Sequence, residues 1–101
     1  MPTLVWSSVF VDWLAAMPDH KGKARILARL DNAALGNFGD CEAIGEGVLE
    51  MRIHYGPGYR VYFVRDGVAV YALLCAGDKG SQRRDIARAK RMARELKGNL
   101  R

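Results

Sequence analysis

The sequence predicts a single domain, residues 1–101, of the α+β class, in which helices pack on a small and mostly antiparallel sheet. Apolar residues recur at helical spacing near both ends of the chain. Residues 49–63 alternate between apolar and polar positions, as half-buried strands do. Asp66-Gly67 separates two apolar segments and is typical of a tight hairpin turn. Half of the residues are apolar, which suffices for one core.

The N-terminal third predicts one short strand and two helices. We expect the strand at residues 2–6, with Ser7-Ser8 after it as candidate helix caps. The first helix has apolar residues at helical spacing: Phe10, Val11, Trp13 and Leu14. Pro18-Asp19 interrupts it, and a second helix is expected over residues 21–35. The buried stripe of the second helix is Ile26, Leu27, Leu30, Ala33 and Ala34.

The middle of the chain predicts three strands. A short strand around residues 41–44 leads through a turn at residues 45–47 into a hairpin. Gly56-Pro57-Gly58 is the expected loop of this hairpin. Its apolar face is expected to hold three cross-strand pairs: Tyr55 with Tyr59, Ile53 with Val61 and Met51 with Phe63.

The opposite face of this hairpin carries polar side chains. The same register predicts two pairs there: His54 opposite Arg60, and Arg52 opposite Tyr62. Guanidinium, imidazole and phenol groups together can bind phosphates and planar bases. The face is therefore a candidate site for RNA, although Arg60 could instead form a structural ion pair with Glu46 or Glu50.

The C-terminal third predicts an interior strand and a helix. Residues 68–76 are almost continuously apolar and follow directly on the Asp66-Gly67 turn. Ser81 is the expected cap of the final helix and Gly98 its expected stop. The inner stripe of this helix is Ile86, Ala89, Met92, Ala93 and Leu96. The element order becomes β-α-α-β-β-β-β-α, with the helices expected against one side of a mixed sheet.

Charge and cysteine content narrow the class of protein. The net charge is +5, and residues 79–101 alone hold nine basic and two acidic side chains, or +7. Such a segment favours binding to polyanions or to an acidic protein partner, although it can also be a solvated helix face. Cys41 and Cys75 lack the spacing of a metal site or disulfide framework. We therefore expect a cytoplasmic protein with no metal, no cofactor and no membrane span.

A series of motifs covers nearly the whole chain: residues 35–40, 45–53, 56–63 and 73–79, followed by Gln82 and Asp85-Ile86. In this order they resemble the RelE/ParE superfamily of bacterial toxins. The resemblance is greatest to its addiction-module killer branch, the phage Gp49-like or HigB-like proteins. It implies a RelE-like fold and the toxin of a type II toxin–antitoxin pair. The expected partner is a small helix-turn-helix antitoxin encoded by an adjacent gene.

RelE-like members are endoribonucleases that cut mRNA without metal, commonly on the ribosome. By this resemblance Arg60 is the phosphate-stabilising arginine. Arg52, His54 and Lys79 are further catalytic candidates because of their side-chain chemistry and their expected positions near the same phosphate. Four more residues are candidates for RNA binding: Tyr62, Gln82, Arg83 and Arg84. Trp6 and Trp13 are expected in the core or in antitoxin contacts rather than under bases.

The proton-transfer group is open, because RelE-type ribonucleases often use a C-terminal Tyr or His and here none follows Tyr71. His54 or Lys79 could serve, or catalysis could depend on charge stabilisation and on orientation by ribosomal RNA. The alternative function is that of ParE-like members, which are proposed to inhibit DNA gyrase by binding it. A remnant that only binds antitoxin is a third possibility.

Overall fold

The computed structural model describes the backbone of residues 1–99 and the side chains of residues 1–97. Its elements follow in the order β1 (Thr3–Trp6), α1 (Ser8–Ala15), α2 (His20–Ala34), β2 (Cys41–Gly45), β3 (Val48–Ile53), β4 (Tyr59–Arg65), β5 (Val70–Asp78), the 3-10 turn η1 (Lys79–Ser81) and α3 (Gln82–Asn99). The expected α+β class and element order are confirmed. No described helix has both the length and the apolar content needed to cross a membrane.

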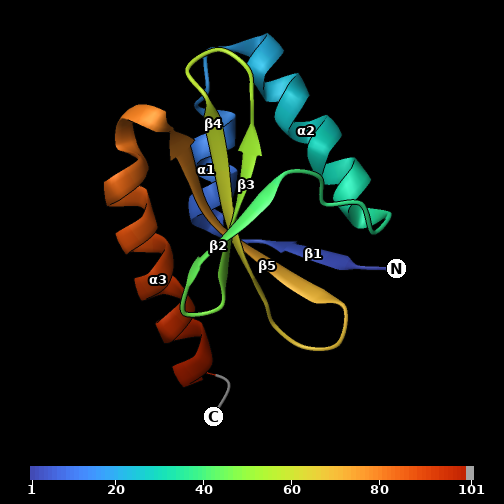
Figure 1. Cartoon of the computed structure of the whole chain (residues 1–101), viewed down its shortest axis with the longest axis vertical. Coiled ribbons are helices and arrows are strands. Elements are labelled where there is room, and N and C mark those ends of the chain that lie inside the picture. Colours follow the sequence, from blue (N-terminus) through green and yellow to red (C-terminus); the bar gives the residue numbers. More distant parts are fainter. Residues whose placement is uncertain (100–101) are drawn as a thin grey trace.

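The five strands form one mixed sheet in the order β1-β5-β4-β3-β2. β1 runs parallel to β5, and the other neighbours are antiparallel. Figure 1 shows α3 on one side of this sheet and α1 and α2 on the other. The prediction that all helices lie on one side is therefore wrong. The β3–β4 face that was interpreted as polar also carries Val48, Tyr62 and Val64. These residues are buried under α3, which is why α3 packs on that side of the sheet.

Two apolar clusters fill the two sides of the sheet. The first lies under α1 and α2 and includes Phe10, Ile26, Met51, Val61 and Phe63. The second lies under α3 and is made of Val48, Tyr62, Val64, Leu74, Cys75, Ala89 and Ala93. The stripes predicted for α2 and α3 are buried or partly buried, whereas Val11 of α1 is exposed, and α3 turns its arginines outward.

Polar caps begin the two N-terminal helices, and the cap of the first, Ser7, was one of the two predicted candidates. The Ser7 hydroxyl accepts a hydrogen bond from the Phe10 backbone at 3.0 Å and donates one to the Leu74 carbonyl at 2.5 Å. Asp19 accepts a bond from the Gly22 backbone at 2.9 Å. Each cap satisfies a helix-end N–H, and such caps typically contribute about 1 kcal/mol.

The register of the β3–β4 hairpin differs from the expected one by two residues. Ile53 pairs with Tyr59, Met51 with Val61, Arg52 with Arg60 and Glu50 with Tyr62. A shift of two positions keeps every side chain on its predicted face. The strand ends at Ile53, so His54 belongs to the loop and does not face Arg60 across the sheet. The loop is longer than predicted because Tyr55 turns back to accept the Gly58 N–H at 3.0 Å.

The β4–β5 hairpin exists, but its loop spans residues 66–69 instead of two residues. The Asp66 N–H donates to the Val70 carbonyl at 2.7 Å, and Ala69 adopts φ 57°. Val68, expected to begin the strand, is exposed in the loop. Within β5 the register shifts opposite Tyr62, so Leu74 and Cys75 both face α3.

The last helix starts differently from the prediction. Asp78 caps the turn η1 that leads into α3: its carboxylate accepts bonds from the Gly80 and Ser81 backbones at 2.8 and 3.2 Å. Ser81 completes a capping box around the short turn η1. α3 continues to Asn99, past the predicted stop at Gly98.

We predict that Tyr59→Phe lowers the melting temperature by several degrees at neutral pH, and by less in acid. The Tyr59 hydroxyl donates to Asp19 at 2.6 Å, and this bond, with the Gly22 N–H, holds the pKa of Asp19 below its ordinary 3.8. The stabilisation is therefore present above pH 3.8 and is lost as the pH falls through the lowered pKa. Thermal unfolding across this range tests it, and a gap that stays constant with pH would contradict it.

Candidate functional site

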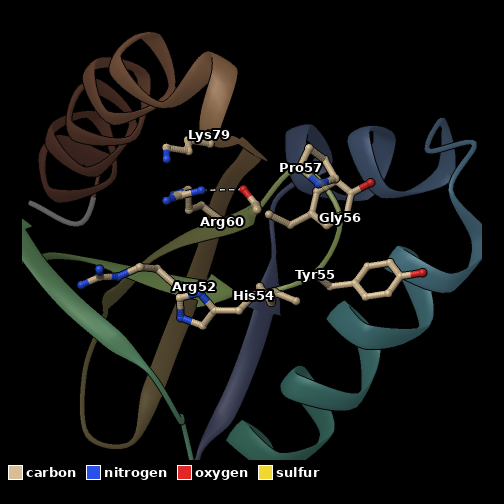
Figure 2. A pocket seen from close by; sticks show the side chains of 10 residues that line it. Arg52, His54, Tyr55, Gly56, Pro57, Arg60 and Lys79 are labelled. Carbon is tan, nitrogen blue, oxygen red and sulfur yellow. Dashed lines mark hydrogen bonds between the residues drawn. The ribbon is translucent and has the colours of Figure 1, made fainter.

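A hollow of about 440 Å³ opens at the loop end of the β3–β4 hairpin. Residues 52–60 and Lys79 line it, so it gathers the end of β3, the loop, the start of β4 and the turn after β5. α3 covers the sheet beyond this point and leaves the last polar pair, Arg52 and Arg60, outside the second core cluster. Figure 2 shows these two side chains with His54 and Lys79 around the opening. Tyr55 points the other way, beneath the Arg25 guanidinium at 4.7 Å.

Glycines in the loop determine how Arg60 lies. Gly58 has φ 81°, a conformation that other residues rarely adopt. Its carbonyl accepts a 2.6 Å bond from Nη1 of Arg60, drawn as the dashed line in Figure 2. A Cβ at Gly58 would stand only 2.9 Å from that same nitrogen. The guanidinium is thus fixed to a backbone that only glycine provides here.

Arg60 carries hydrogen-bonding capacity that the protein does not use. Its Nε is buried and has no hydrogen-bond partner among the described residues. Within residues 1–97 no carboxylate forms an ion pair with it. Arg60 does not form the alternative ion pair with Glu46 or Glu50, since Glu46 pairs with Arg94 at 2.7 Å and Glu50 contacts Arg52. A buried cationic donor without a partner costs free energy, and because Arg60 has no carboxylate partner among the described residues, an incoming anion would have none to displace from it.

Arg52 lies directly across the sheet from Arg60, and like charges in this position repel. Two carboxylates offset that repulsion on the Arg52 side. Glu42 of β2 accepts a bond from Nη2 at 2.5 Å, and Glu50 Oε1 lies 3.8 Å from Nε. Glu42 is largely exposed, so an incoming phosphate can compete with it for Arg52.

His54 extends into solvent from the loop, with 72% of its side chain exposed. Its Nε2 lies 2.5 Å from Asp40 Oδ2, and this bond holds the pKa of Asp40 below its usual range. Arg29 of α2 supports the pair, because it donates to the carbonyls of Phe38, Asp40 and Arg52. Gly39 leaves room for that guanidinium, since a Cβ there would meet it at 2.7 Å.

Lys79 begins η1 and is exposed at the opening. Its expected partner Asp78 forms the turn cap instead, and no ion pair between the two occurs. The ammonium group therefore faces the hollow beside Arg60, as Figure 2 shows. Beneath the turn, the Ser81 hydroxyl donates to the buried carboxylate of Asp85.

We predict that Gly77→Ala displaces the Lys79 turn and destabilises the protein by about 1–3 kcal/mol. A Cβ at Gly77 would overlap Asp85 Oδ2 and come within 2.6 Å of Ser81 Oγ. Urea unfolding measures the loss. Gly80→Ala is the matched control, because its Cβ would meet only Asp78 Oδ1, at 3.1 Å. Equal stability of the two variants would contradict the prediction.

Two predicted RNA-binding residues, Tyr62 and Gln82, form hydrogen bonds to the buried Glu50. Tyr62 is fully buried and donates to Glu50 Oε2 at 2.9 Å, so its ring has no free face for a base. Burial raises the pKa of the Tyr62 hydroxyl, and the bond to Glu50 raises it further. Gln82 donates to the same oxygen at 2.9 Å. Glu50 thus joins β3, β4 and the start of α3, a role that its place in the alternating strand did not reveal.

Arg83 and Arg84 lie outside this hollow and line a second one, next to the η1 turn. The structure therefore brings together Arg52, His54, Arg60 and Lys79, and separates them from the other four predicted residues. Asp40, Glu42 and Arg29 were not expected near the site, because only the folded sheet brings them to it. Over the described part of the chain, no three His, Cys, Asp or Glu side chains gather as a metal site would require.

Two comparisons with known proteins identify the family of this chain. The family model for the phage-derived protein Gp49-like (DUF891) matches residues 12–97, which include every residue that lines the hollow. An uncharacterized protein of Haemophilus influenzae is 42% identical over 87 residues, covering 86% of this chain and 88% of the relative. The chain therefore belongs to the phage-derived Gp49-like family, a RelE-type family of toxins from toxin–antitoxin systems.

Proposed function

We propose that this protein is the toxin of a type II toxin–antitoxin pair and that it cuts mRNA as a metal-independent endoribonuclease. One observation carries the proposal. A guanidinium that is held by a backbone carbonyl and has no carboxylate partner among the described residues stands beside an exposed ammonium, in a hollow that also holds a second guanidinium and an imidazole. Such a set suits a phosphodiester, which is anionic and accepts several hydrogen bonds.

The reaction needs only groups of this kind. The 2′-oxygen of the RNA forms a bond to the neighbouring phosphorus, and the bond from phosphorus to the 5′-oxygen breaks. The products are a 2′,3′-cyclic phosphate and a free 5′-hydroxyl. Negative charge gathers on the phosphoryl oxygens in between, and Arg60 and Lys79 would stabilise it. Because Arg60 is already held by Gly58, little reorganisation is needed as that charge develops.

Two protons must move, one from the 2′-hydroxyl and one to the 5′-oxygen. We assign the removal of the 2′-proton to His54, because imidazole exchanges protons near neutral pH, and solvent water supplies the proton to the 5′-oxygen. The Asp40 contact supports the assignment, since a carboxylate on one ring nitrogen orients the ring and leaves the other nitrogen for substrate. Arg52 would bind an adjacent phosphate once this displaces Glu42.

The partners follow from the same proposal. A helix-turn-helix antitoxin encoded by an adjacent gene would inhibit the protein, and translated mRNA on the ribosome would be its substrate. The basic outer face of α3 supports contact with an acidic protein or with RNA.

Mapping of transcript 5′ ends after brief expression tests the proposal in cells. We expect new 5′-hydroxyl ends within translated messages for the wild type and none for Arg60→Ala. Intact messages together with trapped gyrase–DNA breaks would overturn it in favour of a gyrase inhibitor. Intact messages without growth arrest would also overturn it and would leave antitoxin binding as the remaining role.

A further inference from the structure

A second hollow, of about 530 Å³, lies next to the first. It is lined by Trp13, Gly77, Asp78, Gly80, Ser81, Arg83 and Arg84. Lys79 lines the first hollow, whereas the residues on either side of it in the chain line the second. Consecutive Cα atoms are about 3.8 Å apart, so a single residue separates the two openings.

The second hollow combines cationic groups with an aromatic ring. Arg83 and Arg84 are exposed, and the only ion-pair contact that either of them makes with a described residue is a loose one of 3.9 Å from Arg84 to Asp85. The one carboxylate in the lining belongs to Asp78, and it is occupied by the Gly80 and Ser81 backbones. The two guanidinium groups therefore dominate the local charge.

The aromatic ring is Trp13, and its orientation is set by its neighbours. Its indole stacks on Phe10 with centroids 6.4 Å apart and meets the edge of Tyr59 at 6.2 Å. It is only partly buried, so part of the ring faces the hollow. A ring held in this way can stack on a base with little loss of side-chain entropy.

We propose that the second hollow binds the nucleotide next to the cleaved bond, with its base on Trp13 and its phosphate on Arg83 and Arg84. This rests on the proposed function, because it takes single-stranded RNA as the ligand. One strand would then cross Lys79 and occupy both hollows. Guanidinium groups beside an aromatic face are the usual combination for single-stranded nucleic acid. This proposal differs from the expectation that Trp13 lies in the core or in an antitoxin contact rather than under a base.

The test is a binding experiment that needs no cleavage. Trp6→Phe leaves Trp13 as the single tryptophan of the chain. Short oligonucleotides carrying 2′-O-methyl groups are titrated at low salt, with Trp13 fluorescence and the anisotropy of a labelled oligonucleotide recorded together. We expect fluorescence quenching that saturates with binding. We also expect Arg83→Ala/Arg84→Ala to weaken affinity about tenfold or more and to abolish the quenching.

The matched control is Arg88→Ala/Arg91→Ala, which removes the same charge from exposed positions of α3 outside the hollow. Equal weakening by both double variants would overturn the proposal, since it would reveal only general attraction to the basic helix. Binding without quenching, no binding, or equal quenching by an acidic peptide would each overturn it as well. Failure of the proposed function is seen separately, as intact messages in cells.

Discussion

Replacing Arg60 with alanine should reduce RNA cleavage by about 10²–10³-fold while leaving the protein folded. The guanidinium is the cation of the hollow that is both fixed by the backbone and free of a carboxylate within the described residues. Its loss removes charge stabilisation that grows toward the transition state, so kcat should fall more than KM rises. Cleavage of a defined mRNA in a translating lysate measures the effect.

Arg65→Ala is the matched control for this experiment. Arg65 lies on the same strand, is exposed, and donates only to the Gly67 carbonyl at 3.0 Å. The Arg65→Ala protein should cleave RNA like the wild type. The melting temperatures of both variants show whether any loss reflects unfolding. Full activity of a folded Arg60→Ala protein would remove the case for cleavage at this hollow.

The sequence could predict the faces of the hairpin but not its register. Alternation assigns each side chain to one side of the sheet, and a shift by two residues preserves that assignment. This is why Arg52 and Arg60 were correctly expected on one face. Which residues face each other depends on the loop, and the Tyr55 to Gly58 bond adds residues to a turn that looked shorter.

Contacts between distant segments could not be predicted from spacing. Asp40 reaches His54, and Glu42 reaches Arg52, only because β2 pairs with β3. Arg29 connects both segments to α2 through backbone carbonyls, which leave no pattern in the sequence. Arg60 and Lys79 were both expected near one phosphate, because Lys79 follows the last strand at the start of the final helix, and both residues line the same hollow.

The prediction that the polar face of the hairpin is open around Tyr62 was the remaining error. Tyr62 and Glu50 alternate like solvent-exposed residues, yet α3 covers them. A phenol and a carboxylate can be buried when they bond to each other, so their polarity is no sign of exposure. The predicted RNA contact at Tyr62 failed for this reason.

Glu50→Ala is expected to destabilise the protein by about 3 kcal/mol, because it leaves the Tyr62 hydroxyl buried without its acceptor and opens a cavity. Glu50 is 1% exposed, and its Oε2 accepts both the Tyr62 and the Gln82 bonds. For a domain of this size such a loss lowers the melting temperature by roughly 12–24 °C. Thermal and urea unfolding measure it.

Glu50→Gln separates the two roles of this carboxylate. The amide oxygen can still accept from Tyr62 and Gln82, so stability should fall by less than about 1.5 kcal/mol. The amide nitrogen then replaces Oε1 beside Arg52 Nε, where the structure has a carboxylate oxygen at 3.8 Å. Arg52 would keep only the exposed Glu42.

Glu42→Ala is the control, because it removes only this exposed partner and should change stability by less than about 1 kcal/mol. If Glu50→Ala were as stable as Glu42→Ala, the buried network would not hold α3 against the sheet, and the position of the Lys79 turn would need another cause.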